Sequence, residues 1–260
     1  MIYQSLLTEL NDGILTVTIN RPDKLNALNK MVFDELEMVM NEVASNVAIR
    51  SVIITGSGPK AFAAGADIAE FSEFNREQGE SLSKRGHQVF AMIENSSKPV
   101  VAAVNGFALG GGCELAMACH LRYCATHAKF GQPEVNLGLI PGYGGTQRMT
   151  HLIGKAKSLE LHMTGQIIDA NEAYRLGLVN QVTTAEELIP TVTSVLETIQ
   201  SKAPVAIGHV IRCIQTAVME QGADGYACEA ELFGACFDTE DMREGTRAFL
   251  EKRKANFNGK

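Results

Sequence analysis

The hydrophobic residues of this chain follow two alternating spacings. Short apolar runs, typical of buried strands, occur at residues 14–19, 52–55, 99–104 and 121–125. Between the first two runs, apolar residues recur at the 3,4,3,4 spacing of one helix face, at Phe33, Leu36, Met40, Val43 and Val47. Alternating strands and helices favour an α/β core with mostly parallel strands.

The rest of the chain continues this pattern with turn and capping signals. We expect a Gly- and Pro-rich loop at 56–65, a polar helical segment from about 66 to 95, a helix from about Gly112, a short helix at 146–152, and a helix capped by Asp169 that stops at Gly177. From about Thr184 the pattern is almost purely helical. The predicted organisation is a core of residues 1–195, which would carry any active site, and a helical C-terminal region of residues 196–260.

The C-terminal helical region is more apolar than a solvated tail needs. Residues 228–237 and 248–250 are the clearest examples. We expect them to bury surface against another subunit.

Composition limits the class of protein. A chain of 260 residues with 45% hydrophobic and 20% charged residues can bury a large core. No apolar run approaches the ~20 residues that span a bilayer, and residues 1–10 lack a secretory or transit signal, so we expect a soluble, cytoplasmic protein. The net charge of −7 argues against binding to nucleic acid or to an acidic membrane.

The six cysteines indicate reduced, packed thiols. They lie at positions 113, 119, 124, 213, 228 and 236 and form no Cys-x-x-Cys pair. Cys119, His120, Cys124 and His127 match none of the usual zinc spacings, so we expect no metal. Cys113 has no histidine placed by the sequence to activate it, which leaves a packed cysteine as the better interpretation.

The glycine-rich segments do not match nucleotide-binding motifs. The segments that begin at Gly110 and Gly142 lack the third glycine of a dinucleotide fingerprint, and Gly56-Ser-Gly-Pro-Lys60 lacks the P-loop arrangement. Glycines also serve tight turns and expose backbone N–H groups to an anion. Gly111 would lie near a helix N-terminus, and residues 64–67 form a second strand-to-helix junction, so these segments could supply two halves of an oxyanion hole.

Two glutamates are the candidate chemical groups. Glu114 and Glu134 each lie beside glycine-rich backbone in apolar surroundings. A carboxylate there is costly unless it is hydrogen-bonded or has a shifted pKa. Two such groups facing one pocket would form an acid/base pair able to move protons near neutral pH.

Six segments, in order along nearly the whole chain, carry a resemblance to a known family. They are Asn20-Arg-Pro22 with Leu25-Asn-Ala-Leu28, Ala61-Phe-Ala-Ala-Gly-Ala-Asp-Ile68, Asn105-Gly-Phe-Ala-Leu-Gly-Gly-Gly-Cys-Glu-Leu115, Phe130-Gly-Gln-Pro-Glu134, Pro141-Gly-Tyr-Gly-Gly-Thr-Gln-Arg148 and Phe249-Leu-Glu-Lys-Arg-Lys-Ala-Asn-Phe257. The chain resembles enoyl-CoA hydratase of the crotonase family.

The resemblance implies a spiral of ββα units with a helical C-terminal region, assembled as a homotrimer or a dimer of trimers. It also implies an acyl-CoA thioester substrate and no cofactor beyond the CoA of that substrate. The amides of Ala66 and Gly111 would hold the thioester oxygen, and Glu114 and Glu134 would hold the catalytic water. The residues that would contact CoA or the acyl group are Lys24, Leu25, Ala64, Asp67, Ile68, Gly142, Phe249 and Lys252, the last two reaching CoA bound mainly by a neighbouring subunit.

The alternatives concern the substrate and the reaction. Keeping both glutamates favours hydration over the isomerase, decarboxylase and dehalogenase relatives, which commonly lack one. A hydratase of a branched enoyl-CoA such as 3-methylglutaconyl-CoA, or an enoyl-CoA isomerase, is the alternative within the family. An RNA-binding relative exists, but a chain of net charge −7 gives that interpretation no support. Tyr143 either reshapes the acyl pocket or packs outward, and the acyl chain length and pathway stay open.

Overall fold

The computed structural model describes residues 3–219 and 225–260. The strands are β1 (Leu6–Asn11), β2 (Ile14–Ile19), β3 (Ser51–Gly56), β4 (Ala61–Ala64), β5 (Val100–Val104), β6 (Phe107–Leu109), β7 (Leu121–Ala125), β8 (Lys129–Gly131), β9 (Ile167–Asp169) and β10 (Gln181–Thr183). The α-helices are α1 (Lys30–Ser45), α2 (Arg76–Glu94), α3 (Gly111–Ala118), α4 (Gly145–Ile153), α5 (Lys155–Thr164), α6 (Ala170–Arg175), α7 (Leu188–Gln200), α8 (Pro204–Met219), α9 (Gly225–Cys236) and α10 (Glu240–Leu250). Short 3₁₀ helices are η1 (Pro22–Lys24), η2 (Ile68–Glu70) and η3 (Pro133–Leu137).

The larger sheet has the strand order β1-β2-β3-β5-β7-β10. Its neighbouring strands are parallel, except that β1 and β2 form an antiparallel hairpin. The hairpin turns at Asp12 and Gly13, whose positive φ angles of 49° and 80° suit a tight two-residue turn. Every residue of β3 and β5 is buried, as expected of central parallel strands covered on both faces. The predicted α/β core with mostly parallel strands is confirmed.

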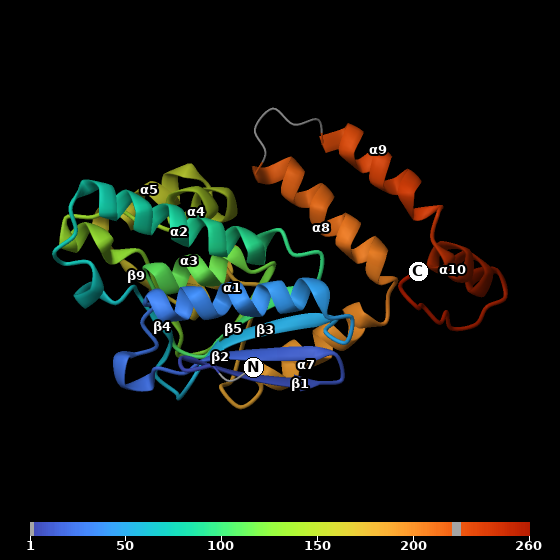
Figure 1. Ribbon diagram of the computed structural model, residues 1–260, viewed down its shortest axis with the longest axis horizontal. Helices are drawn as coiled ribbons and strands as arrows, with labels where there is room; N and C mark the ends of the chain where they lie inside the picture. The colour runs from blue at the N-terminus through green and yellow to red at the C-terminus, as the bar shows by residue number, and fades with distance from the viewer. Residues whose placement is uncertain (1–2, 220–224) are drawn as a thin grey trace.

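Helices cover both faces of this sheet (Figure 1). Val52 and Ile54 of β3 join the core cluster that contains α1 and α2, whereas Ile53 joins a cluster with α7. This division follows from the two-residue side-chain period of a strand. Each face of the sheet therefore has its own core cluster, one under α1 and α2 and the other under α7.

The helix predicted from the first apolar spacing is α1. It begins after Asn29, whose side chain accepts a hydrogen bond from Val32 N at 3.0 Å. Phe33, Leu36, Met40 and Val43 are buried as predicted. The prediction for Val47 is wrong, because α1 ends at Ser45 and Val47 is 93% exposed.

A second, smaller sheet has the strand order β4-β6-β8-β9. Strands β4, β6 and β8 are parallel, and β9 is antiparallel to β8. The predicted loop at 56–65 is therefore wrong over residues 61–64, whose Ala-Phe-Ala-Ala sequence carries no two-residue period. The sheets meet closely there: a Cβ at Gly56 would lie 2.3 Å from the carbonyl oxygen of Ala61.

Of two other predicted helices, one begins later than expected and one is confirmed. The polar segment predicted from residue 66 contains only η2 before Asn75 caps α2 with a capping box. The Asp169 side chain caps α6 as predicted, accepting from Glu172 N at 2.9 Å, and α6 ends before Gly177, where φ is 80°.

The C-terminal helices α8, α9 and α10 stand apart from the sheets (Figure 1). In contrast, α7 packs on the large sheet through Leu188, Val192 and Leu196. The predicted division at residues 195 and 196 thus falls inside α7, and residues 220–224 of the predicted helical region lie outside the described residues. No helix among the described residues is long and apolar enough to cross a membrane.

Candidate active site

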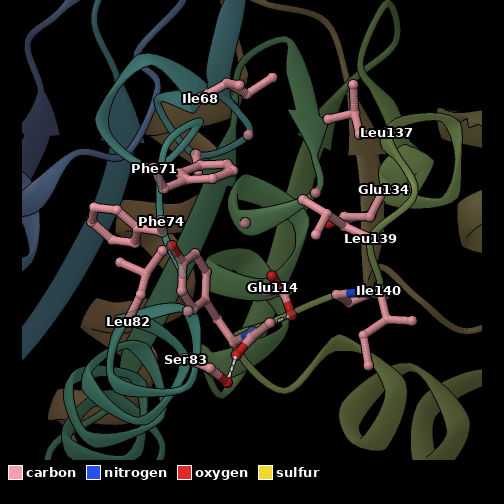
Figure 2. A pocket seen from close by; sticks show the side chains of 18 of the residues that line it. Ile68, Phe71, Phe74, Leu82, Ser83, Glu114, Glu134, Leu137, Leu139 and Ile140 are labelled. Carbon is pink, nitrogen blue, oxygen red and sulfur yellow. Dashed lines mark hydrogen bonds between the residues drawn. The ribbon is translucent and has the colours of Figure 1, made fainter. Parts of the chain in front are cut away.

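A cavity of about 630 Å³ opens between the small sheet and the start of α2. Figure 2 shows Ile68, Phe71 and Phe74 on one side and Leu137 and Ile140 on the other. These apolar walls come from segments without a regular hydrophobic period. The shape and lining suit a ligand with an apolar group.

Glu114 lies at the inner wall of this cavity (Figure 2). It belongs to α3, and its exposed fraction is only 1%. Its Oε1 atom accepts hydrogen bonds from the backbone N–H groups of Tyr143 at 2.8 Å and Gly145 at 2.7 Å. Burial raises the pKa of Glu114 to about 7, the Gly145 N–H opposes that rise, and the charge of Glu134 adds to it. The carboxylate therefore exchanges a proton readily near neutral pH.

Helix α3 can occupy this position because its second residue has no side chain. A Cβ at Gly112 would lie 1.8 Å from the carbonyl oxygen of Ala63 in β4. Glycine thus allows α3 to contact the backbone of the small sheet. Residues 111–118 are all buried as a result.

Glu134 faces the same cavity from the start of η3 (Figure 2). Burial raises its pKa to about 7, an effect partly offset by a hydrogen bond from its own backbone N–H. Gly110 makes room for the carboxylate: a Cβ there would lie 2.8 Å from Glu134 Oε1. When the amide of Gln132 is oriented to satisfy its hydrogen bonds, it donates to Oε1 at 3.0 Å and to Oε2 at 3.2 Å.

The pairing of its neighbours leaves the N–H of Ala66 without an acceptor among the described residues. Leu28 forms a parallel bridge with Ala66. Leu28 N donates to Gly65 O at 2.9 Å, and Asp67 N donates to Leu28 O at 2.8 Å. In a parallel bridge of this kind the central residue directs its own N–H to the opposite side, and Ala66 lines the cavity there.

The N–H of Gly111 also lacks an acceptor within the part of the chain that the structure describes, for a different reason. Gly111 is the first residue of α3, so its N–H has no acceptor within the helix. The preceding Gly110, with φ of 49°, donates its own N–H to Gly131 O at 2.9 Å. Gly111 lines the cavity with Ala66, and two free amides beside one cavity can bind an oxygen that gains negative charge.

Three more residues predicted from the sequence line the cavity, namely Ala64, Ile68 and Gly142. Asp67 instead forms an ion pair with Arg21 at 2.8 Å, and the hydrogen bond from Arg21 lowers its pKa. Lys24 and Leu25 lie outside the cavity lining, although Leu25 O accepts from Ala64 N at 3.0 Å. Contact of these three with CoA stays a prediction.

Phe249 lies in the last turn of α10 and Lys252 follows it, and neither residue lines the cavity. Helix α10 stands apart from the sheets (Figure 1). Both residues are exposed, and Phe249 is 82% exposed. Their predicted contact with CoA on a neighbouring subunit stays a prediction.

Tyr143 packs inward. The residue is 5% exposed, and its ring stands edge-on to Phe33 and Phe90, with centroid distances of 5.0 and 5.9 Å. It also borders the cavity. Of the two interpretations of Tyr143 from the sequence, the structure excludes outward packing.

Sequence reasoning missed Ser83 and Gln132. Ser83 lines the cavity from α2, and its Oγ donates to Gly142 O at 2.6 Å (Figure 2). Gln132 adjoins Pro133 in the segment that carries Glu134 and could have been noticed for that position. Ser83 lies in a polar helical segment with no motif around it. Among the described residues, no three His, Cys, Asp or Glu side chains group closely enough to hold a metal ion.

This site, with a buried and a half-buried carboxylate beside two backbone amides that have no acceptor among the described residues, is that of an acid/base enzyme built on an α/β fold. The chain belongs to the enoyl-CoA hydratase/isomerase family, whose model matches residues 9–260. It is 46% identical over 258 residues to crotonyl-CoA hydratase of Syntrophomonas wolfei, with 99% of each chain covered. It is 44% identical over 254 residues to short-chain-enoyl-CoA hydratase of Clostridium acetobutylicum, covering 98% of this chain and 97% of the relative.

Solved structures agree with this assignment. The crystal structure of enoyl-CoA hydratase from Bacillus anthracis matches with a TM-score of 0.94 and 34% identity, over 99% of this chain and 100% of the other. An enoyl-CoA hydratase structure from Geobacillus kaustophilus has a TM-score of 0.94 and 38% identity, over 99% of both chains. The fold predicted from the resemblance is confirmed.

Proposed function

We propose that this protein adds water across the 2,3 double bond of short trans-2-enoyl-CoA thioesters to give 3-hydroxyacyl-CoA. The observation that carries the proposal is the pair of carboxylates, Glu114 and Glu134, both with the pKa raised to about 7 at one cavity. Such a pair can hold one acid and one base at neutral pH. The names of the two relatives, crotonyl-CoA hydratase and short-chain-enoyl-CoA hydratase, support both the reaction and the short acyl group.

The first step uses Glu114 as the base. Its carboxylate accepts two backbone hydrogen bonds, which favour the ionised form. Glu114 takes one proton from water while the water oxygen forms a bond to Cβ of the substrate. The electron pair of the double bond moves toward the thioester, so negative charge grows on the carbonyl oxygen.

The amides of Ala66 and Gly111 bind that oxygen. Because these donors are fixed by the bridge at Leu28 and by the start of α3, they need little reorganisation as the charge develops. Loss of one such donor typically costs ~3 kcal/mol of transition-state stabilisation. Glu134, protonated at the start, then gives its proton to Cα, which completes the addition of water.

The same proposal includes the assembly and the compartment. Several large apolar side chains of the C-terminal helices are exposed, namely Val210, Ile214, Val218, Tyr226, Phe233, Phe237, Phe249 and Leu250. A surface of this kind is typical of a subunit interface, so we expect a homotrimer or a dimer of trimers. Light scattering after size exclusion would test it, and a monomer at micromolar concentration would contradict it. The six free cysteines support a reducing, cytoplasmic compartment.

The test is the loss of conjugated-thioester absorbance when the purified protein is added to crotonyl-CoA. Glu114→Gln and Glu134→Gln should each reduce kcat by at least about 100-fold, as expected for loss of a general acid or base. Glu186→Gln, at an exposed turn position, is the matched control and should keep wild-type activity. Binding of saturated butyryl-CoA to each variant would show that the site is intact.

Branched enoyl-CoA and 3-enoyl-CoA substrates test the two alternative activities within the family. Activity on 3-methylglutaconyl-CoA but not on crotonyl-CoA would favour the branched hydratase, and conversion of 3-enoyl-CoA without hydration would favour an isomerase. Unimpaired hydration by Glu134→Gln would refute the role given to that residue.

A further inference from the structure

The loop at residues 141–145 supplies both hydrogen bonds to Glu114. The peptide group between Gly142 and Tyr143 donates through Tyr143 N, at 2.8 Å. Two residues later, Gly145 N donates at 2.7 Å to the same oxygen. The position of the Glu114 carboxylate therefore depends on how this loop is held.

Ser83 holds the first of these peptide groups. The hydroxyl of Ser83, on α2, donates to the carbonyl oxygen of Gly142 at 2.6 Å (Figure 2). That carbonyl belongs to the same peptide group whose N–H donates to Glu114. The three groups form one chain, from the Ser83 hydroxyl through the peptide to the carboxylate. Hydrogen bonds in such a chain polarise one another, so each bond strengthens the next.

Arg148 holds the next peptide group. Its Nη1 atom donates to Tyr143 O at 2.8 Å, and Nε and Nη2 bind both carboxylate oxygens of Glu94 at 2.9 and 2.8 Å. The loop closes tightly on this guanidinium, because a Cβ at Gly144 would lie 2.4 Å from Nη1. Arg148 and Glu94 are both buried, so this side of the loop is anchored in the core.

Ser83 is the anchor on the cavity side. It is half-buried and lines the cavity, whereas Arg148, the other anchor, is buried in the core. With both anchors, the loop is restrained on two sides. Without Ser83, the Gly142 carbonyl would lose its only protein donor among the described hydrogen bonds, and the peptide group could rotate.

We propose that Ser83 is a positioning residue for Glu114: its hydroxyl fixes and polarises the peptide group that donates to the catalytic carboxylate. The inference rests on the proposed hydration, because it gives Ser83 a part in preparing the base of that reaction. Ser83 acts through the loop and does not need to touch the reacting atoms.

The test compares Ser83→Ala with Ser83→Thr, which keeps a hydroxyl. Ser81→Ala is the matched control, because Ser81 is exposed on the same helix. Ala has a higher helix propensity than Ser, so Ser83→Ala should fold. We expect Ser83→Ala to lower kcat by about 3- to 10-fold with little change in KM, as for loss of one hydrogen bond in the transition state.

The pH profile separates positioning from a merely structural effect. The N–H of Tyr143 lowers the pKa of Glu114, so a weaker donor raises it. The ionised carboxylate is the base, and the acid limb of kcat should therefore move upward, by about half a pH unit. Ser83→Thr and Ser81→Ala should keep the wild-type limb. An unmoved limb in Ser83→Ala, or the same shift in Ser83→Thr, would overturn the proposal.

A second measurement does not require turnover. Infrared difference spectra recorded against pH show the carbonyl band of protonated Glu114, which Glu114→Gln identifies by removing it. That band should persist to higher pH in Ser83→Ala than in wild type, and an identical titration would again overturn the proposal. A wild-type protein that lacks hydratase activity would refute the proposed function alone, since the infrared titration still reports whether Ser83 acts on Glu114.

Discussion

The ring of Tyr143 fills the space that a side chain at Gly86 would need. A Cβ at Gly86 would lie 2.0 Å from Cδ1 of the ring. The same ring lies against the first residue of α3: a Cβ at Gly111 would be 3.1 Å from its Cε2 atom. Packing between α2 and Tyr143 thus reaches the amide that we propose binds the substrate oxygen.

Gly86→Ala should therefore destabilise the protein, although alanine favours helices. Overpacking of a core typically costs about 1–3 kcal/mol, which exceeds the ~1 kcal/mol that alanine contributes in a helix. Gly79 on the same helix is the control, because a Cβ there would meet no atom within 4 Å. Urea unfolding should show a lower free energy of unfolding for Gly86→Ala and an equal or higher one for Gly79→Ala. Equal effects at the two positions would contradict the packing argument.

Tyr143→Ala should shift the preference toward longer acyl groups. Removing the ring enlarges the cavity at its inner end, where Tyr143 contributes to the lining. Each methylene accommodated in an apolar pocket is worth about 10-fold or more in specificity. The ratio of kcat/KM for octenoyl-CoA to that for crotonyl-CoA should rise by at least about 10-fold. Tyr143→Phe keeps the ring and should keep the ratio, whereas an unchanged ratio in Tyr143→Ala would show that the ring does not limit chain length.

Activity should follow a bell-shaped pH profile around neutrality. The pKa values of Glu114 and Glu134 are both raised to about 7. At low pH both are protonated and the base is missing; at high pH both are ionised and the acid is missing. Because the two groups interact, the limbs belong to the pair. In the residual activity of Glu134→Gln the alkaline limb should disappear, since glutamine does not titrate, and its persistence would assign that limb to another group.

Glu114 should make stability depend on pH. Its folded pKa lies above its unfolded value, mainly because of burial. Its contribution is therefore fully present below the unfolded pKa and is lost as pH rises through about 7. Glu114→Gln should be more stable than wild type at pH 8, by roughly 3 kcal/mol, and the gain should shrink at pH 5. Urea unfolding at the two pH values measures the difference in the free energy of unfolding between variant and wild type. A difference that does not change with pH would argue against a raised pKa of Glu114.

The buried pair of Arg148 and Glu94 should matter far more than an exposed pair. Arg148→Met leaves the Glu94 carboxylate uncompensated, a change that typically costs about 3–5 kcal/mol. Arg85→Met, which removes a partly exposed pair with Asp34 and Glu37, should cost ~1 kcal/mol or less. The double variant Glu94→Gln with Arg148→Met should lose less than the sum of the single losses in urea unfolding. Additive losses would mean that the two side chains act separately.

The sequence predicts the parts of this molecule that depend on local pattern. Apolar spacing and capping residues predicted α1, β3, β5, β7 and the cap of α6. A buried strand or helix face requires apolar residues at regular positions, and a helix start requires a side chain that accepts from its free N–H groups. The sequence of β4 shows no such spacing. Its alanines are small enough to pack against β3 and α3, and neither alternation nor a turn signal marks them.

The candidate site likewise contains residues that the sequence predicted and residues that it did not. The sequence singled out Glu114 and Glu134 because carboxylates are unusual in apolar surroundings. The apolar walls at Phe71, Phe74 and Ile140 come from irregular segments, whose residues meet only in the tertiary structure. Ser83 could not be found, since a serine in a polar helix gives no sign of the carbonyl that it will reach.

The free amide of Ala66 has a consequence for how this chemistry can be lost or altered. The donor is part of the main chain, held by the bridge to Leu28, so exchanging the side chain at 66 leaves it in place unless proline is introduced. A single codon change can remove either carboxylate, but the amide that we propose binds the substrate oxygen is kept as long as the fold is kept. Removing it cleanly calls for chemical synthesis, with an ester linkage in place of the amide between Gly65 and Ala66.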